Sequence, residues 1–246
     1  MDRKERILAF MREDAYKPLL FNELVMVLDV PKSDIELFRQ VLEELEREGK
    51  IFKTHKNRYG VPERMSLIVG RLQGNERGYG FVIPDDETFD DIFIPADGLN
   101  GAMHNDRVIA RYTKKVIGDR SAEGEIIRIL DRANKTVVGI FESSRYFGFV
   151  VPDDRRISGD IFVPKDEFNG AKSGDKVVVE IVKWPEKRRN AEGKVIEVIG
   201  NVNDPGTDIV SIIKSFKLNE TFPDDVLAQA DKIPDTVTED MLKGRR

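Results

Sequence analysis

The sequence predicts a mainly β protein with a helical N-terminal module followed by two small five-stranded barrels. Three observations predict this class. Apolar residues recur at helical spacing in the first part of the chain, whereas short runs that alternate between apolar and polar residues follow from residue 63 onward. The middle of the chain also contains two copies of one pattern about 69 residues apart, so that Ile92-Phe93 aligns with Ile161-Phe162. A repeat of this length is a whole small domain.

Residues 1–62 are expected to form three helices and a hairpin, which together make a winged helix. The apolar stripes of the three helices are Ile7, Leu8, Phe10 and Met11; Leu24, Val25, Val27 and Leu28; and Ile35, Phe38, Val41, Leu42 and Leu45. Segments 50–53 and 58–62 predict the two strands of the hairpin.

Local signals place the ends of these helices. Asn22 is a candidate cap for the second helix. Ser33 and Glu36 form a candidate capping box, in which Ser33 is the N-cap of the third helix. Gly49 follows the last apolar residue of that helix and is expected to end it.

The charges of this module argue against sequence-specific DNA reading. The third helix would be the reading helix, and phosphate repels it because most of its charged positions are acidic. Those acidic residues are Asp34, Glu36, Glu43, Glu44, Glu46 and Glu48. The hairpin carries the basic residues Lys50, Lys53, Lys56 and Arg58. We therefore expect the module to dock a protein partner, to make auxiliary RNA contacts, or to serve as a stable N-terminal cap.

Residues 63–130 and 131–200 predict two five-stranded barrels. The strands expected in the first barrel are Leu67–Leu72, Tyr79–Pro84, Asp91–Pro95, Arg107–Tyr112 and Gly124–Leu130. The turn dipeptides Asn100-Gly101 and Asn169-Gly170 stand at equivalent places in the two copies. Short alternating strands with glycine-rich turns are typical of an OB-type barrel, which commonly binds single strands.

Strand alternation predicts an exposed aromatic surface on each barrel. Successive side chains of a strand point to opposite faces, so Tyr79 and Phe81 share one face while Val82 faces the other. On the next strand, the side chain of Phe93 points to the face opposite to that of its two isoleucine neighbours. If the aliphatic residues face inward, the aromatic residues form one outward surface on which bases of single-stranded RNA can stack. The second copy repeats the arrangement with Phe147, Phe149 and Phe162.

Two arginines begin these runs, and one alternative remains open. Arg77 and Arg145 stand ahead of the aromatic residues, where they would meet phosphates or stack on bases. The alternative is that the aromatic residues form the cores of two ordinary barrels. The repetition of both aromatic motifs at similar spacing favours nucleic-acid binding over that alternative.

These runs resemble a known family. The run RGYGFV at 77–82, followed by DIFIP at 91–95, resembles the two nucleic-acid motifs of a cold-shock domain. The second copy has Tyr146 where the first has Gly78, and both copies lack the Val-Phe-Val-His of free-standing cold-shock proteins. The tandem cold-shock domains of ribonuclease R-like members of the ribonuclease II/R family share these departures. Those proteins also resemble this chain in having an N-terminal helix-turn-helix-like module.

The resemblance implies a function for the chain. It would be the RNA-binding N-terminal region of a processive 3′-to-5′ exoribonuclease, gripping single-stranded or structured RNA. Residues 201–246 would be the incomplete start of the RNB-type nuclease domain. In this family, aspartates of that domain hold Mg²⁺, which clamps the reacting oxygens. No such aspartate cluster occurs after residue 200, so the chain alone is expected to have no catalytic activity and no cofactor.

No other catalytic or metal-binding motif stands out. The acidic pairs Asp85-Asp86, Asp90-Asp91 and Asp153-Asp154 repeat between barrel strands and are expected to be solvated turns, although carboxylates there could bind Mg²⁺. His55 and His104 without cysteine do not make a zinc site. The glycines at 78 and 80 lack the lysine and helix of a phosphate-binding loop.

Composition bounds the environment and the mode of binding. The chain has 246 residues, no cysteine and a formal charge of −5. It contains no apolar stretch of membrane-spanning length. We expect a cytoplasmic monomer without a membrane partner. No segment is basic overall, so binding should be moderate, salt-sensitive and dependent on stacking as well as on phosphate contacts.

The sequence says less about the conformation and role of the remaining segments. Residues 183–189 form a basic loop with the only tryptophan, which either contacts RNA or is solvated. Residues 208–216 fit a helix or a strand, and residues 228–233 predict a helix. Two other functions stay open, namely a stand-alone RNA chaperone of cold-shock type and a winged-helix transcription regulator.

Overall fold

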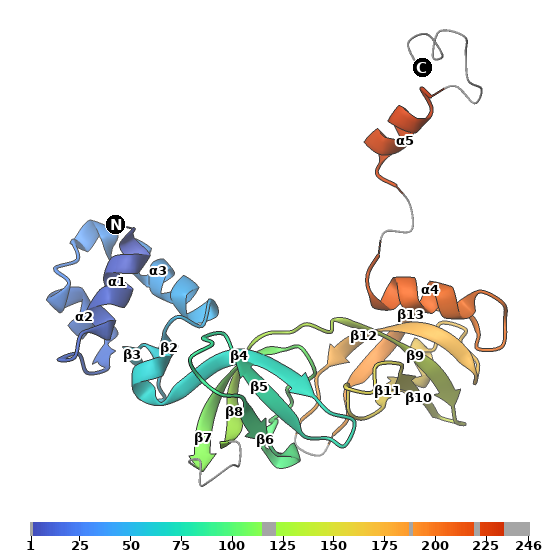
Figure 1. Cartoon of the computed structure of the whole chain (residues 1–246), viewed down its shortest axis with the longest axis horizontal. Coiled ribbons are helices and arrows are strands. Elements are labelled where there is room, and N and C mark those ends of the chain that lie inside the picture. The colour runs from blue at the N-terminus through green and yellow to red at the C-terminus, as the bar shows by residue number, and fades with distance from the viewer. Residues whose placement is uncertain (1, 115–121, 187–188, 219–221, 234–246) are drawn as a thin grey trace, which may run out of the picture.

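The computed structural model describes residues 2–114, 122–186, 189–218 and 222–233. A helical module comes first, two barrels follow side by side, and helix α4 (Thr207–Ser215) lies against the second barrel (Figure 1). The predicted class, mainly β with an α N-terminal module and two five-stranded barrels, is confirmed. Among the described residues, no helix has the length and apolar character needed to cross a membrane.

The N-terminal module consists of three helices and a small antiparallel sheet, as in a winged helix. Its elements are α1 (Arg3–Arg12), β1 (Leu19–Leu20), α2 (Phe21–Val27), the 3₁₀ turn η1 (Lys32–Asp34), α3 (Ile35–Arg47), β2 (Phe52–Lys53) and β3 (Arg58–Gly60). The predicted hairpin is β2 and β3. The sequence prediction omitted β1, a two-residue strand that pairs with the far side of β3.

The second helix differs from its prediction at both ends. Asn22 lies inside α2 and does not cap it. The carboxylate of Glu23 instead accepts a hydrogen bond from the N–H of Leu20 at 2.8 Å, which holds the chain at the helix start. Val27 was expected to be buried but is 56% exposed, because α2 ends at this residue and only Leu24 points fully into the core.

The third helix begins one residue later than predicted. A 3₁₀ turn, Lys32–Asp34, precedes it, so Asp34 takes the N-cap position. The Ser33 hydroxyl donates to the Asp34 carboxylate instead of capping the helix, and the predicted capping box with Glu36 is absent. Gly49, with a φ of 73°, ends the helix as predicted. A left-handed conformation at that place is accessible to glycine without steric cost.

The module is joined to the first barrel through Arg128. The guanidinium carbon of Arg128 lies 4.6 Å from the centroid of the Phe52 ring, and the guanidinium also forms an ion pair with Glu46. Gly49 lies against the side chain of Leu130, where a Cβ atom would come within 2.6 Å of a Leu130 methyl carbon. These contacts connect α3 and the wing directly to β8, the last strand of the first barrel.

The two barrels have the same strand order. The first contains β4 (Leu67–Gly74), β5 (Gly80–Pro84), β6 (Ile92–Ile94), β7 (Arg107–Lys114) and β8 (Glu123–Asp131). The second contains β9 (Thr136–Ser143), β10 (Phe147–Pro152), β11 (Ile161–Pro164), β12 (Asp175–Lys183) and β13 (Glu192–Asn201). Each closes with its third strand parallel to its fifth, as in an OB barrel. All five strands predicted for the first barrel are present within a few residues of their expected ends.

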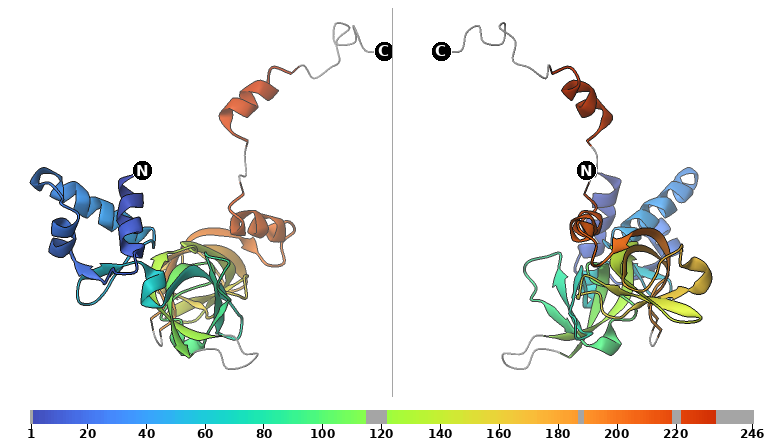
Figure 2. Two further views of the ribbon diagram at one scale, coloured as in Figure 1. Left: turned by 60° about the vertical axis from the view of Figure 1, so that its left-hand side comes forward. Right: turned by 90° about the vertical axis from the view of Figure 1, so that its right-hand side faces the viewer.

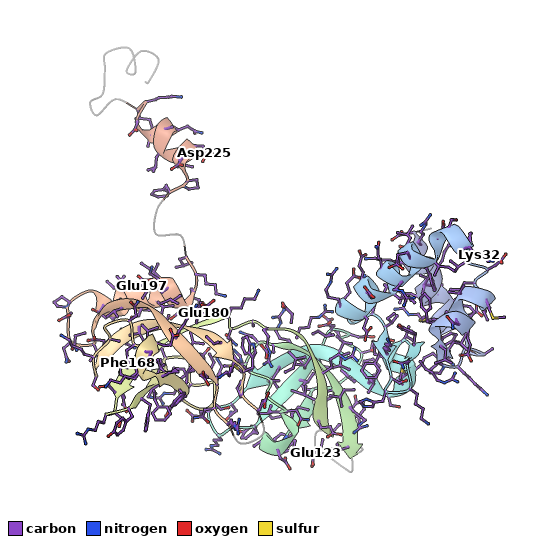
Figure 3. All side chains as sticks on the ribbon, turned by 180° about the vertical axis from the view of Figure 1, so that it is seen from behind. Lys32, Glu123, Phe168, Glu180, Glu197 and Asp225 are labelled. Carbon is purple, nitrogen blue, oxygen red and sulfur yellow. The ribbon has the colours of Figure 1, made fainter. Side chains whose placement is uncertain are left out.

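Aliphatic side chains fill both barrels. The first core contains Ile68, Leu72, Val82, Ile92, Ile94, Ala102, Val108, Ala110 and Ile126. The second contains Val137, Phe141, Val150, Ile161, Val163, Val177, Val179 and Val195, among others. Phe141 is fully buried and packs on Phe168, which is labelled in Figure 3, with 4.8 Å between the ring centroids.

The barrels meet through a polar joint. Arg132, between them in sequence, donates to the carbonyl oxygen of Gly101 at 2.7 Å and to the carboxylate of Asp106 at 2.9 Å. Its guanidinium carbon also lies 4.3 Å from the centroid of the Trp184 ring. Burial raises the pKa of Asp106, and its hydrogen bonds and the nearby Arg132 oppose that shift. The only tryptophan thus lies in the joint between the barrels.

The segment after the second barrel is helical. Residues 208–216, which fitted either a helix or a strand, lie largely in α4, which packs on β9, β12 and β13 (Figures 1 and 2). Lys214 of α4 pairs with Glu197 of β13 at 3.0 Å (Figure 3). The helix expected at 228–233 begins earlier, as α5 (Asp224–Ala230). The basic end at 243–246 lies outside the described residues.

Candidate nucleic-acid interface

Three aromatic rings lie together on the outside of the first barrel. Phe81 of β5 is directly paired with Phe93 of β6, and their ring centroids are 5.6 Å apart. Tyr79, just before β5, lies 5.9 Å from the Phe81 ring and 5.5 Å from the Phe93 ring. We call these three residues platform 1.

The second barrel repeats this arrangement. Phe149 of β10 is paired with Phe162 of β11, with 5.9 Å between ring centroids. Phe147 lies 5.3 Å from Phe149 and 5.9 Å from Phe162. We call these three residues platform 2. The two platforms use equivalent strands and similar ring spacings, so both copies of the sequence repeat build the same surface.

The glycines between the aromatic residues explain why the rings face outward. A Cβ atom on Gly80 would come within 2.8 Å of a Leu72 methyl carbon, and one on Gly148 within 2.5 Å of the Phe141 ring. Both glycines therefore face the narrow interior of their barrels. Because successive side chains alternate between faces, the aromatic neighbours must face outward.

The six rings are only partly covered. None belongs to a barrel core, and each keeps an accessible face, with Phe147 36% exposed. Rings in contact cover one another's edges, which accounts for their partial burial. The arrangement provides flat apolar surface at the size of a nucleic-acid base, on two neighbouring barrels.

The two predicted arginines lie beside the platforms and are exposed. Arg77 occupies the turn before β5, where its backbone N–H donates to the side chain of Asn75 at 3.0 Å. The guanidinium carbon of Arg145 lies 5.8 Å from the centroid of the Tyr146 ring. Neither arginine has a carboxylate within ion-pair distance in the described part of the chain. Both therefore present an unpaired positive charge to solvent.

The sequence reasoning noted Tyr146 but did not include it among the site residues. Its side chain is 70% exposed, lies near the Arg145 guanidinium and directly precedes Phe147 of platform 2 in the sequence. The equivalent position of the first barrel is Gly78, which has a φ of 84°. At this position the second barrel thus carries an exposed ring that the first barrel lacks. The sequence signal that could have identified Tyr146 is the difference between the two copies at this position.

Two of the three acidic pairs between strands contain carboxylates that are ion-paired with cations. Asp85 pairs with Arg107 at 2.7 Å, Asp153 pairs with Lys176, and Asp154 pairs with Arg156 at 2.9 Å. Within the described ranges, no group of three acidic or histidine side chains could hold a metal ion. The carboxylates of Asp85 and Asp153 therefore tie barrel loops to neighbouring strands, and the described residues do not bring three such ligands together for a Mg²⁺ ion.

The two histidines have different surroundings. His55 lies exposed in the wing. His104 is only 4% exposed, and its Nδ1 atom accepts a hydrogen bond from the N–H of Gly74 at 3.2 Å. Burial lowers the pKa of His104, and the nearby Arg156 lowers it further. His104 is therefore a neutral side chain near the contact between the barrels.

The basic side chains of the wing are largely occupied within the N-terminal module. Lys50 pairs with Glu48 at 2.8 Å, and Arg58 pairs with Glu23 at 3.2 Å. The Lys53 ammonium lies 5.4 Å from the centroid of the Tyr59 ring. In the 183–189 loop, Lys183 pairs with Glu192 at 2.9 Å, while residues 187–188 lie outside the described ranges. The platforms, with their unpaired arginines, are thus the better candidate interface.

Comparison with curated proteins extends over nearly the whole chain. Ribonuclease R of Thermotoga maritima is 37% identical over 99% of this chain. Ribonuclease R of Escherichia coli is 32% identical over 93% of it. The chain is homologous to ribonuclease R. It spans about a third of these relatives, 34% of the first and 28% of the second, and 55% of ribonuclease R of Acidithiobacillus ferrooxidans. The resemblance stated from the sequence is thereby confirmed.

Domain families and solved structures agree with this relationship. The ribonuclease B OB domain family matches residues 70–129, and the cold shock domain family matches residues 149–223. The apo form of Mycoplasma genitalium ribonuclease R has a TM-score of 0.60 at 23% identity, covering 73% of this chain and 28% of that one. Yeast Ssd1, a pseudonuclease, has a TM-score of 0.51 at 19% identity, covering 76% of this chain and 26% of its own. At these identities the structures show a shared fold.

Proposed function

We propose that this chain is the RNA-binding N-terminal part of a ribonuclease R-like 3′-to-5′ exoribonuclease. It grips single-stranded or structured RNA on its two barrels and feeds it toward a catalytic domain that lies outside this sequence. The observation that carries the proposal is the pair of matching, outward-facing platforms. Homology to ribonuclease R supports it, as does a solved complex of the Mycoplasma genitalium enzyme with ribose-methylated single-stranded RNA, a protein of similar fold.

Stacking supplies most of the affinity in this proposal. Each base that stacks on an aromatic side chain contributes about 1–3 kcal/mol and needs no particular sequence. Arg77 and Arg145 add phosphate contacts at the edge of each platform. The chain carries a formal charge of −5, so its overall field repels RNA and binding depends on these local contacts. Affinity should therefore fall with salt, but less steeply than for a basic protein.

The catalytic step belongs to the domain outside this sequence. We propose that Mg²⁺ binds there, because the described barrel residues bring no three carboxylate or histidine side chains together, and Asp85, Asp153 and Asp154 are held in ion pairs. The division we propose is a winged-helix domain at 1–62, cold-shock domains at 63–130 and 131–200, and the start of the nuclease domain at 201–246. We further propose that the chain alone is inactive and that it is cytoplasmic. We propose that it acts as a monomer, because each platform is complete within one copy.

The N-terminal module has a separate proposed role. Met26 and Val27 are 80% and 56% exposed, and Leu37 is 43% exposed, on a module whose acidic third helix repels nucleic acid. Exposed apolar side chains are suited to contact with another protein. We propose that the module docks a protein partner through these side chains.

Fluorescence anisotropy with labelled single-stranded RNA tests the main proposal. The combined substitution Phe81→Ala and Phe149→Ala removes one ring from each platform. The expected loss of affinity is at least about 30-fold, from two stacked bases at about 1 kcal/mol or more each. Phe216→Ala is a matched control, because that ring is 73% exposed directly after α4, a helix that packs on β9, β12 and β13, whereas the platforms lie on β5, β6, β10 and β11. Unchanged binding by the double variant would refute the platforms and direct attention to the wing and the 183–189 loop.

Two further assays separate the alternative functions. A stand-alone chaperone would melt RNA hairpins on binding, whereas a feeding module would bind them without net melting. A transcription regulator would bind duplex DNA tightly with a site preference. The acidic side chains of α3 and the paired cations of the wing argue against that last outcome.

A further inference from the structure

A cavity of about 500 Å³ lies between the two barrels. The barrels touch at two places on its border. At one, a Cβ atom on Gly101 would come within 2.2 Å of the Pro185 carbonyl oxygen; at the other, one on Gly74 would come within 2.4 Å of the Arg156 carbonyl oxygen. Both backbones are therefore in close contact at these points and leave open space between them. Arg132 reinforces the first contact through Gly101 and Trp184.

The cavity borders platform 1 and one end of a platform 2 strand. Tyr79 of platform 1 forms part of its wall on the first barrel. On the second barrel the wall includes Ile161, the first residue of β11, whose own side chain is buried in the barrel core. Strand β11 continues from there to Phe162 of platform 2, so an RNA strand bound to platform 1 would reach the cavity directly and β11 leads from the cavity to platform 2.

The walls carry polar groups suited to a base and a ribose. Ser158, Arg189 and Asn190 contribute from the second barrel, and the Asn190 amide forms no hydrogen bond in the described part of the chain. The acidic residues Asp97, Asp160 and Glu186 outnumber the cations Arg156 and Arg189 in the walls. Carboxylates and amides accept or donate hydrogen bonds at base edges and at the 2′-hydroxyl, but they repel a buried phosphate.

One buried atom at this joint also lacks a partner. Because Nδ1 of His104 accepts a hydrogen bond from Gly74, the neutral ring carries its hydrogen on Nε2. The Nε2 atom is buried and has no hydrogen-bond partner among the described residues. Buried donors are rarely left unpaired, so the first-barrel side of the cavity is a place where an added acceptor would be favourable.

We propose that this cavity holds one nucleotide of a single-stranded RNA whose neighbouring bases stack on both platforms. The base and ribose lie inside, and the flanking phosphates face Arg189 at the rim. The two barrels then bind one continuous strand, and the cavity sets its path. The inference rests on the proposed function, because it requires the platforms to bind RNA. A volume of about 500 Å³ is within the range of small-molecule sites, which hold ligands of nucleotide size.

The test compares short and long RNAs. Anisotropy would be measured with polyuridine oligomers from about 4 to about 16 nucleotides, which brackets the site size of one or two OB barrels. Short oligomers reach one platform, whereas long ones reach both, so the wild-type affinity should rise by at least about 100-fold between them. Ser158→Leu fills the cavity without adding an aromatic ring, and Asn190→Ala removes the free amide.

Both variants should weaken binding of the long oligomers at least about tenfold and leave binding of the short ones within about twofold. Ser33→Leu, an equivalent exposed change in the N-terminal module, should alter neither. Long-oligomer binding that stays at the wild-type level in both variants would overturn the cavity proposal while the platforms stand. An absence of binding by short oligomers to the wild type would instead refute the platforms themselves, and the cavity proposal with them.

Discussion

The substitution Gly148→Ala tests why a glycine is needed between the aromatic residues Phe147 and Phe149 of strand β10. The added methyl group would lie 2.5 and 2.6 Å from the Cε2 and Cζ atoms of Phe141, where ordinary contact is 3.4–4 Å. About 1 Å of movement is therefore needed. The Phe141 ring is fully buried and packs on Phe168 at 4.8 Å, so it has little room to turn.

Overpacking of this kind costs about 1–3 kcal/mol. The backbone entropy that alanine saves in a strand offsets about 0.5–1 kcal/mol of it. We expect a net loss of about 1–2 kcal/mol in the free energy of unfolding of the second barrel. Urea unfolding followed by the fluorescence of Trp184 measures it, because this is the only tryptophan and it packs against the second core.

A double-mutant cycle identifies the clashing atoms. Leucine in place of Phe141 lacks both ring atoms that the new methyl group meets. The cost of Gly148→Ala should therefore fall by about 1 kcal/mol or more in the Phe141→Leu background. An unchanged cost in that background, or a stability of Gly148→Ala within about 0.5 kcal/mol of the wild type, would refute the reasoning.

Three further predictions follow from the structure. Tyr146→Ala should weaken single-stranded RNA binding at least about fivefold in anisotropy measurements, because one stacking ring is lost; equal affinity would place Tyr146 outside the interface. A hydrogen bond from Lys4 lowers the pKa of Glu48 to about 2, so Glu48 contributes stability above its unfolded pKa of about 4.5 that is lost as the pH falls toward 2. Glu48→Gln should therefore destabilise the module by less than about 1 kcal/mol at pH 7 and by a smaller amount at pH 3, measured by urea unfolding. Arg128→Ala should speed proteolytic separation of the N-terminal module from the first barrel, since the ion pair with Glu46 is removed; an unchanged cleavage rate would show that the joint does not depend on this arginine.

Local patterns were sufficient for most of the β structure. The alternation in each copy predicted which side chains face outward, because a strand has only two faces and the aliphatic residues identify the inner one. The same patterns failed at helix ends. Ser33 and Glu36 have the spacing of a capping box, yet a 3₁₀ turn moves the N-cap position to Asp34, and the helix begins at Ile35. Residue types alone do not show whether the first turn of a helix takes the 3₁₀ or the α conformation.

The N-terminal sheet shows a second limit. Strand β1 has two residues and is a strand only through its pairing with β3. Similarly, periodicity did not decide between helix and strand for residues 208–216, which became α4 by packing on β9, β12 and β13. Short segments of this kind take their conformation from the surface that they contact.

The sequence by itself determined two barrels, two outward-facing aromatic surfaces and the arginines beside them, because repetition and the period of a strand are both properties of the chain. Only the tertiary structure decided that three rings on each barrel touch, that Lys50 and Arg58 of the wing are ion-paired and that Trp184 lies in the joint. It also created the cavity between the barrels, whose walls come from residues as far apart as Gly74 and Asn190. Such contacts depend on how two closed barrels pack against each other, and no local sequence spacing encodes the distance between the barrels.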